Sequence, residues 1–344
     1  MIIRARAPLR LGLAGGGTDV SPYSDEYGGL VLNTTIDRYA YASITINNNN
    51  ANKIEFFSSD KNVKDSYLIS ETIELDGPTL LLKATYLHMI KNFNNGNKIA
   101  LTLTTFCDSP PGSGLGTSST LVVAMVEAFR HLLNLKLDSY QIAEIAYKIE
   151  RVECKLLGGK QDQYSASFGG FNYIEFNKSN EVIVNNLDID SYVIQELEAS
   201  LLLFFTGVSR DSDKIILNQS KNMIKKDKKA MEALHIIKNE AQNMKNKILS
   251  GDFYGIVESM RTGWTNKKKS ADVISNPLIE EIYDTAIDAG ALAGKVSGAG
   301  GGGFMIFYIP IGKRKLVIES LGQFNGEVSN THFTNIGVKS WKLA

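Results

Sequence analysis

Apolar and β-branched residues alternate, or run together, in four segments of the first third of the chain. These segments are RLGLA, YAYASITI, KIEFF and KIALTLTT, at positions 10–14, 39–46, 53–57 and 98–105. A period of two with many β-branched side chains is typical of half-buried strands. The pattern therefore predicts that the four segments form one sheet.

Helical spacing of apolar residues interrupts these strands. The run TSSTLVVAMVEAFRHLL at 117–133 carries apolar residues every three or four positions, which predicts an amphipathic helix. A second helix is predicted over 139–157, with a stripe of Ile142, Ile145, Ile149, Val152 and Leu156. Two glycines then end this helix, so the following GGKQDQY is expected to be a loop.

The second half repeats this order of strand, helix and strand. An apolar strand is predicted at 201–206, lysine-rich helices at 211–249, a helix at 277–289 and a strand at 304–309. Strands and helices in both halves predict an α+β fold of two domains, 1–190 and 191–344. The length of 344 residues agrees, since one domain usually takes about 100–200 residues.

The charge and composition of the chain limit the classes of partner that it can bind. Lysine plus arginine and aspartate plus glutamate each number 37, so the chain lacks the broad basic field that nucleic acid or an anionic membrane attracts. Two cysteines make no disulfide framework, and no apolar run approaches the ~20 residues of a membrane span. We expect a cytoplasmic protein whose partners are small molecules, without nucleic acid or membrane; the sequence is also compatible with a homodimer.

Three glycine-rich segments are candidates for ligand binding. The first, GLAGGGTD at 12–19, follows a strand, and its glycines allow a ligand to approach the backbone closely. Asp19 could accept hydrogen bonds from sugar hydroxyls, although a structural turn capped by Thr18 or Asp19 has the same sequence. The candidate substrate contacts here are Gly15, Gly16, Gly17, Thr18 and Asp19.

The second segment, PPGSGLGTSST at 110–120, joins a predicted strand to the start of the helix at 117–133. The first N–H groups of a helix have no partner within it and lie at its positive end, which together attract an anion such as phosphate. No lysine precedes the hydroxyl residues, so this is not a Walker A loop. Helix capping by Ser118 or Ser119 is the alternative interpretation, but capping alone does not account for three glycines.

The third segment, SGAGGGG at 297–303, contains a formal G-x-G-x-x-G at Gly298, Gly300 and Gly303. In dinucleotide-binding proteins this motif opens a helix, whereas here a predicted strand follows. The order of elements therefore argues against an NAD-dependent oxidoreductase. It favours a glycine loop that could close over a ligand, with Gly300 and Gly301 as candidate contacts.

Two acidic residues are candidates for the chemistry. Glu150 lies off the charged face of its predicted helix, among the small residues Ala143, Ala146 and Cys154, so its carboxylate needs a metal ion or a buried cation as partner. Glu153 is the second choice for that role. Asp162 follows in the expected loop, where a turn aspartate is the simpler interpretation.

Together, the order of these motifs resembles that of the GHMP kinases, the family of galactokinase, homoserine kinase and mevalonate kinase. APLRLGLAGGGTD resembles the family's first motif, PPGSGLGTSST its second and KVSGAGGGGFM its third, so that the resemblance spans nearly the whole chain. It implies an N-terminal domain like domain 2 of ribosomal protein S5 and a ferredoxin-like C-terminal domain. It also implies ATP and Mg²⁺ as cofactors.

The resemblance also implies roles for individual residues. Glu150 precedes Asp162 by twelve residues, the interval found in galactokinases. Asp162 then corresponds to the catalytic aspartate and Arg10 to the basic residue beside it, while Ser119 and Glu150 correspond to the magnesium ligands. The ATP phosphates are expected on Pro111, Gly112, Ser113, Gly114, Leu115, Gly116, Thr117, Ser118 and Ser119.

One departure from the galactokinase pattern bears on the sugar. Gly16 and Gly17 stand where galactokinases have glutamate and histidine, and AGGGTD instead resembles the heptose phosphate kinase and fucokinase branch. The resemblance implies phosphorylation of the anomeric hydroxyl of D-glycero-D-manno-heptose 7-phosphate, on the route to bacterial surface polysaccharides. We expect Arg210 to bind the substrate phosphate, ahead of Lys160, Lys214 and Arg261.

Two alternatives stay open at this point. The first is a GHMP kinase for an unphosphorylated sugar such as fucose. The second is a catalytically silent family member that binds sugar and ATP as a regulator, against which the presence of Arg10, Ser119, Glu150 and Asp162 argues.

Overall fold

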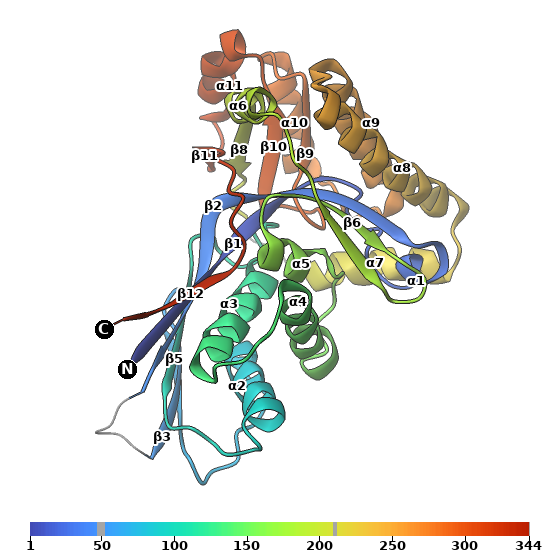
Figure 1. Cartoon of the computed structure of the whole chain (residues 1–344). Helices are drawn as coiled ribbons and strands as arrows, with labels where there is room; N and C mark the ends of the chain where they lie inside the picture. The colour runs from blue at the N-terminus through green and yellow to red at the C-terminus, as the bar shows by residue number, and fades with distance from the viewer. Residues whose placement is uncertain (47–51, 209–211, 344) are drawn as a thin grey trace.

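The computed structural model describes residues 1–46, 52–208 and 212–343. Figure 1 shows a sheet with helices on one face in the N-terminal half, and a second sheet with its own helices in the C-terminal half. The predicted α+β fold is confirmed. No helix in the described ranges is long and apolar enough to cross a membrane.

The first sheet has eight strands in the order β12-β1-β2-β5-β3-β4, and β6 pairs with both β2 and β7. A short helix, α1 (Tyr23–Tyr27), connects the two longest strands, β1 and β2. The strands are β1 (Ile2–Ala14), β2 (Gly29–Thr45), β3 (Lys53–Ser58), β4 (Val63–Leu68), β5 (Thr102–Cys107), β6 (Phe171–Phe176), β7 (Val182–Asn186) and β12 (Lys339–Leu343).

Strand β1 is longer than the predicted segment at 10–14, and it is irregular where it approaches the ligand-binding candidates. Its register against β2 shifts between Pro8 and Arg10 and again between Gly12 and Ala14. Such irregularities bend a strand and redirect its side chains. The end of β1 thereby presents Arg10, and after it the first glycine segment, to the second half of the molecule.

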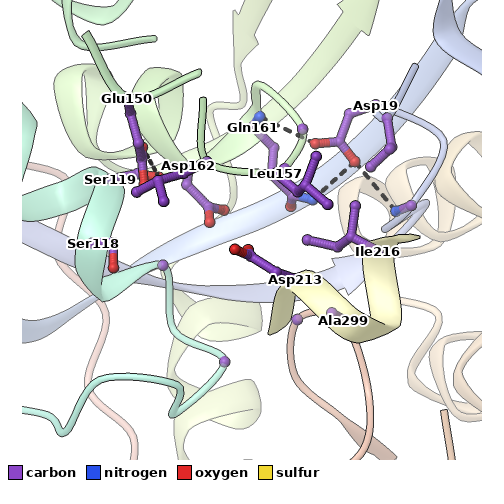
Figure 2. Close-up of a pocket in the computed structure, with 18 of the residues that line it drawn as sticks. Asp19, Ser118, Ser119, Glu150, Leu157, Gln161, Asp162, Asp213, Ile216 and Ala299 are labelled. Atoms are coloured by element: carbon purple, nitrogen blue, oxygen red, sulfur yellow. Dashed lines mark hydrogen bonds between the residues drawn. The ribbon is translucent and has the colours of Figure 1, made fainter. Parts of the chain in front are cut away.

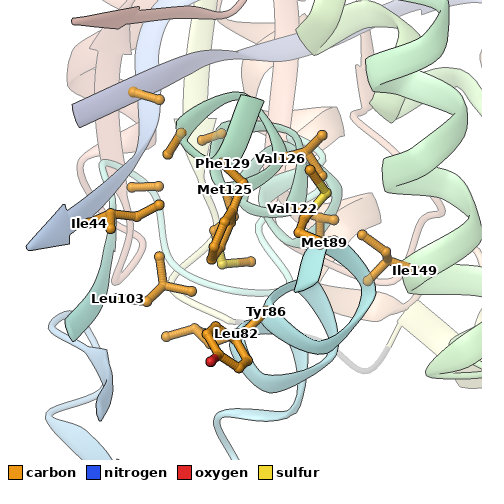
Figure 3. Packing of buried hydrophobic residues seen from close by; sticks show 14 of the residues in the cluster. Ile44, Leu82, Tyr86, Met89, Leu103, Val122, Met125, Val126, Phe129 and Ile149 are labelled. Atoms are coloured by element: carbon orange, nitrogen blue, oxygen red, sulfur yellow. The ribbon is translucent and has the colours of Figure 1, made fainter. Parts of the chain in front are cut away.

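Helices cover one face of the first sheet and bury a core of aliphatic and aromatic side chains (Figure 3). Tyr86 and Met89 from α2 pack there with Val122 and Phe129 from α3, all fully buried. The helices are α2 (Leu80–Phe93), α3 (Thr117–Leu132), α4 (Ser139–Tyr147), the π-helical turn η2 (Lys148–Glu153) and α5 (Gln161–Phe168).

Two predictions about this region were wrong in detail. The helix expected over 139–157 stops being α-helical at Tyr147 and continues as the π-helical turn η2, which contains Glu150. The segment expected to be a loop around Asp162 is helical instead, because α5 begins at Gln161. Asp162 therefore lies in the first turn of a helix, where the positive end of the helix dipole favours a carboxylate.

The second sheet has four antiparallel strands in the order β11-β8-β10-β9. They are β8 (Leu201–Phe205), β9 (Ala293–Val296), β10 (Phe304–Tyr308) and β11 (Glu327–Asn330). The helices of this half are α6 (Ser191–Ser200), α7 (Ser212–Ile224), α8 (Lys228–Ser250), α9 (Phe253–Ser270), α10 (Pro277–Asp288), the 3₁₀ turn η3 (Ile311–Lys313) and α11 (Arg314–Leu321).

The two halves share a buried core. Leu11 and Leu32 of the first sheet belong to the same apolar cluster as Ile248 of α8, Met260 of α9 and Phe304 of β10. The chain then returns, since β12 pairs with β1 from Lys339 to Leu343. The division at residue 190 stays a prediction. The shared core packs the two halves against each other, and residues of both halves line the cavity described below.

Candidate active site

A cavity of about 310 Å³ lies where the three glycine-rich segments meet. Gly17 reaches it from the first segment, and Gly298 and Ala299 reach it from the third. The second segment contributes Gly112, Gly114, Gly116, Thr117, Ser118 and Ser119. Figure 2 shows Asp162 and Asp213 on different walls with their carboxylates directed into the cavity. Segments far apart in the sequence thus build one concave site.

The second glycine segment has the backbone of an anion-binding loop. Gly112, Gly114 and Gly116 have φ angles of +73°, +83° and +78°, a region that side-chain-bearing residues rarely adopt. Gly116 is the N-cap of α3, and no side chain caps this helix end. The capping alternative for Ser118 and Ser119 therefore fails, and the N-terminal N–H groups of α3 face the cavity that Gly116, Thr117 and Ser118 line.

Not every residue of this segment lines the cavity. Leu115 is fully buried in the core shared by the two halves, and its carbonyl accepts a hydrogen bond from the Arg10 N–H at 3.2 Å. Ser113 is also fully buried, and its carbonyl accepts a hydrogen bond from the Phe304 N–H at 2.8 Å. These two residues hold the loop in place, and Pro111 does not line the cavity.

Arg10 and Asp162 form an ion pair directly beside this loop. The Arg10 Nε donates to Asp162 Oδ1 at 2.7 Å, and its Nη1 donates to the carbonyl of Gly114. A Cβ atom on Gly116 would lie 3.0 Å from the Asp162 Cγ, so this carboxylate packs closely against the loop. The pairing inferred from family resemblance is present, with Asp162 in contact with the phosphate loop.

Ser119 and Glu150 meet in the floor of the cavity. The Ser119 hydroxyl donates to Glu150 Oε2 at 2.6 Å, and the Gln163 amide donates to the same carboxylate oxygen at 2.7 Å. The Arg151 Nη1 lies 3.4 Å from Glu150 Oε1. Glu150 is 1% exposed, so its buried charge has the partners it requires. Glu153, the second choice, is instead paired with His88 at 2.7 Å.

The first glycine segment is organised around Asp19. Its carboxylate accepts hydrogen bonds from the Gly17 N–H at 3.2 Å and from the Gln161 backbone and side chain at 3.2 and 3.1 Å. Gln161 directly precedes Asp162, so Asp19 connects this segment to the first turn of α5. A Cβ on Gly159 would lie 1.9 Å from Asp19 Oδ2, so any side chain there would displace this carboxylate.

The glycines of the first segment differ in what they contact. A Cβ on Gly15 would lie 2.0 Å from the carbonyl oxygen of Leu30, so this glycine is required by packing against β2. The Thr18 hydroxyl lies 2.8 and 2.9 Å from the carbonyl oxygens of Gly15 and Leu30, which share its one proton. Gly17 lines the main cavity, while Gly15 and Gly16 line a smaller pocket beside it.

The third glycine segment mainly supports the second. Gly303 has a φ of +80°, and a Cβ there would lie 2.3 Å from the carbonyl oxygen of Ser113. The Ser297 hydroxyl donates to the carbonyl of Gly114 at 2.9 Å. Gly300 and Gly301, the predicted substrate contacts, pack against Ile274, and it is Gly298 and Ala299 that reach the cavity.

Two lysines from the C-terminal half were not anticipated from the sequence. Lys267 of α9 is 8% exposed and lines both the main cavity and the smaller pocket, and Lys295 of β9 lines the smaller pocket. Burial, with Lys267 and Arg10 nearby, lowers the pKa of Lys295 to about 7. Lys267 lies in an NKKKS run that is typical of a solvated helix face, so its spacing carried no signal of burial.

Helix α7 adds a polar wall that the sequence also did not indicate. Asp213, Ile216 and Gln219 recur at intervals of three, and all three line the main cavity. Arg210, predicted to bind the substrate phosphate, lies outside the described residues. Of its alternatives, Arg261 pairs with Glu258 on the exposed surface, and Lys160 donates to Asn180 at 2.7 Å.

Comparison with known proteins decides the family. The description "GHMP kinases N terminal domain" matches residues 80–170, and "GHMP kinases C terminal" matches residues 244–324. A D-glycero-alpha-D-manno-heptose 7-phosphate kinase of Campylobacter jejuni is 43% identical over 341 residues, which cover 99% of both chains. The chain belongs to the GHMP kinases. The family resemblance of the three motifs is thereby confirmed, and GHMP kinases use ATP as the phosphate donor.

Two solved structures and one further sequence relative agree with this membership. A D-glycero-D-manno-heptose 1-phosphate kinase of Bacteroides thetaiotaomicron is 41% identical, with a TM-score of 0.84 and 99% of each chain covered. A putative sugar kinase of Campylobacter jejuni is 42% identical, with a TM-score of 0.82 and 99% and 98% covered. An L-fucokinase/L-fucose-1-P guanylyltransferase of Bacteroides fragilis is 26% identical over 88% of this chain and 34% of its own.

Proposed function

We propose that this GHMP kinase transfers the γ-phosphoryl group of ATP to the anomeric hydroxyl of D-glycero-D-manno-heptose 7-phosphate. The product is the 1,7-bisphosphate, a precursor for bacterial surface polysaccharides. Support comes from the identity to the Campylobacter relative named as a heptose 7-phosphate kinase. The two partners of the enzyme are then ATP and a sugar phosphate.

The observation that carries the chemistry is the contact between Asp162 and the phosphate loop. Asp162 is paired with Arg10 at 2.7 Å, and a Cβ on Gly116 would lie 3.0 Å from its carboxyl carbon. A hydroxyl bound at Asp162 is therefore adjacent to phosphates bound at the start of α3. Phosphoryl transfer depends mainly on such positioning and on charge neutralisation.

In the proposed reaction, one bond to the γ-phosphorus forms and another breaks. The anomeric oxygen forms a bond to the γ-phosphorus, the bond from that phosphorus to the bridging β,γ-oxygen breaks, and ADP leaves. Asp162 orients the hydroxyl and accepts its proton, or directs that proton to solvent. Arg10, 4% exposed, holds the Asp162 carboxylate in place, and the N–H groups at the start of α3 stabilise the transferred phosphoryl group.

Ser119 and Glu150 fit the requirements of a magnesium site. Mg²⁺ prefers oxygen ligands and is usually held by one or two carboxylates together with substrate phosphates. A hydroxyl and a carboxylate 2.6 Å apart beside the phosphate loop provide that donor set. When bound there, Mg²⁺ would neutralise phosphate charge, which matters in a loop that has no lysine of the Walker type.

A substrate panel tests the proposed reaction. The purified enzyme is given Mg-ATP with D-glycero-D-manno-heptose, its 7-phosphate, its 1-phosphate and L-fucose, and phosphorus NMR locates the new phosphate. We expect turnover of the 7-phosphate and a new signal from an anomeric phosphate. One heptose kinase relative is named for the 7-phosphate and the other for the 1-phosphate, so the position of the new phosphate must be measured directly. A product phosphorylated away from C1 would overturn the proposal.

The same preparation separates the remaining alternatives. Preference for L-fucose or for unphosphorylated heptose would identify a kinase of the fucokinase kind, and binding of ATP and sugar without ADP release would identify a silent regulator. Analytical ultracentrifugation of that sample tests whether the enzyme forms a homodimer.

A further inference from the structure

A small pocket adjoins the main cavity on the side of the C-terminal half. It shares Gln161, Lys267 and Gly298 with that cavity, and it adds Lys295. The backbone of residues 12–16 forms another of its walls. Because Gln161 directly precedes Asp162, the pocket begins one residue away from the proposed reaction centre.

The charge in this pocket has one sign. Lys267 and Lys295 both line it, and none of the described residues around it is acidic. The Lys267 Nζ donates to the carbonyl of Gly16 at 2.8 Å, while the Lys295 Nζ donates to the carbonyls of Gly12 and Leu13 at 2.7 and 3.0 Å. Carbonyl dipoles orient the Lys295 ammonium group but do not neutralise it, and a buried ammonium group beside a second lysine favours the approach of an anion.

These contacts also leave Lys295 able to bind a ligand. An ammonium group has three N–H donors, and the carbonyls of Gly12 and Leu13 use two of them. The glycines of the first segment keep the opposite wall free of side chains, and a Cβ on Gly16 would lie 3.6 Å from the Lys267 Nζ. An anion can therefore approach the two ammonium groups over the bare backbone.

We propose that Lys267 and Lys295 form the subsite for the phosphate that the sugar substrate already carries. This inference rests on the proposed function and assigns to these two lysines the role first expected of Arg210. With the anomeric hydroxyl at Asp162, the sugar extends past Gln161 and Gly17, and the phosphate at its other end reaches the lysines. The glycines at positions 16 and 17 leave room for the longer substrate.

The first test compares Michaelis constants. Lys267→Met and Lys295→Met should each raise the KM for heptose 7-phosphate by about 10- to 100-fold, the usual loss for a charge-assisted hydrogen bond. The KM for ATP and the kcat/KM for unphosphorylated heptose should change by less than about threefold. Lys267→Arg, which keeps the charge, should recover most of the affinity.

Lys268→Met is the matched control, since Lys268 is the next residue on the same helix and pairs with Glu280 at 2.9 Å. It should leave the KM for heptose 7-phosphate unchanged. If Lys267→Met and Lys295→Met instead raise the KM for ATP, the lysines serve the ATP phosphates and the proposal fails. If both sugars are affected equally, the lysines only anchor the glycine segment, and the proposal again fails.

A second measurement uses inorganic phosphate and the wild-type enzyme, so it does not depend on turnover or on the stability of a variant. Lysines are labelled by reductive ¹³C-methylation, and the methyl signal that titrates near neutral pH is followed with and without phosphate. Phosphate at the subsite should raise that midpoint by about 1–3 pH units. An unchanged midpoint overturns the subsite, whereas a wild-type enzyme that prefers unphosphorylated heptose overturns only the proposed function.

Discussion

The two sides of the cavity are built in different ways. The side where we propose that the ATP phosphates bind comes from one stretch of chain between Gly112 and Ser119, whose shape follows from three glycines and the start of α3. The side proposed to bind the sugar, together with the smaller pocket beside it, collects single side chains from α7, α9 and β9, with Asp213, Lys267 and Lys295 among them. In the proposed function, phosphate binding thus depends on a contiguous motif, whereas recognition of the sugar depends on tertiary contacts.

The largest expected effect on turnover comes from Asp162, which lies where the two sides of the cavity meet. Asp162→Asn should lower kcat by about 100- to 10,000-fold, because the variant loses the carboxylate that orients the hydroxyl and accepts its proton. The affinity for ATP, measured by calorimetry, should change little. Asp284→Asn, on the exposed face of α10, is the control and should keep full activity. Near-normal turnover by Asp162→Asn would remove this residue from the mechanism.

A second variant tests whether the ATP side depends on the C-terminal half. In Gly303→Ala the new Cβ would lie 2.3 Å from the carbonyl oxygen of Ser113 at a φ of +80°, so the phosphate loop must move. We expect the KM for ATP to rise by about tenfold or more and the free energy of unfolding to fall by about 1–2 kcal/mol. Gly312→Ala, which has no atom within 4 Å of its Cβ, should change neither.

A rise in pH should weaken binding of the sugar phosphate alone. The pKa of Lys295 is lowered to about 7, so this lysine loses its charge as the pH rises from 7 to 9, while a sugar phosphate is already a dianion above its pKa of about 6. A bound phosphate stabilises the charged lysine, so affinity should fall as the pH rises. We expect the KM for heptose 7-phosphate to rise about tenfold over this range, and to stay flat in Lys295→Met.

The smallest expected effect comes from Ser297, which connects the third glycine segment to the second. Ser297→Ala removes the hydroxyl that donates to the Gly114 carbonyl at 2.9 Å and accepts a long hydrogen bond from the Arg10 Nη1 at 3.5 Å, while Arg10 still donates to the Gly114 oxygen. Loss of one such hydrogen bond costs about 1 kcal/mol, or roughly a fivefold rise in the KM for ATP. A rise well above that would show that Ser297 contacts the nucleotide itself.

The difference between the two sides explains where sequence reasoning succeeded. The phosphate loop was identified because three glycines directly before a helix are needed at adjacent positions, and the structure gives all three positive φ angles. The Arg10–Asp162 pair came from family resemblance, since the two residues are 152 positions apart. The loop predicted around Asp162 is wrong, because Gly158 and Gly159 lie only shortly before a new helix, which begins at Gln161.

Other features were beyond the reach of sequence patterns. Lys267 stands in a lysine run that is typical of an exposed face, yet the packing of α9 against β1 buries it beside Gly16. The support that Gly303 gives to Ser113 depends on β10 lying next to the phosphate loop, about 190 residues later in the chain. Gly300 and Gly301 had the composition of ligand contacts, but the turn directs them toward Ile274.

By itself, the sequence determined the fold class and the position of the glycine loop before α3, because these depend on local periodicity and on backbone angles that only glycine readily adopts. The kinase family came from the resemblance of the three glycine-rich motifs to those of GHMP kinases. The tertiary structure decided which charged groups face the sugar. Whether a lysine is solvated or enclosed depends on which helix packs over it, and that packing is set by the core that Leu11 and Leu32 share with Met260 and Phe304.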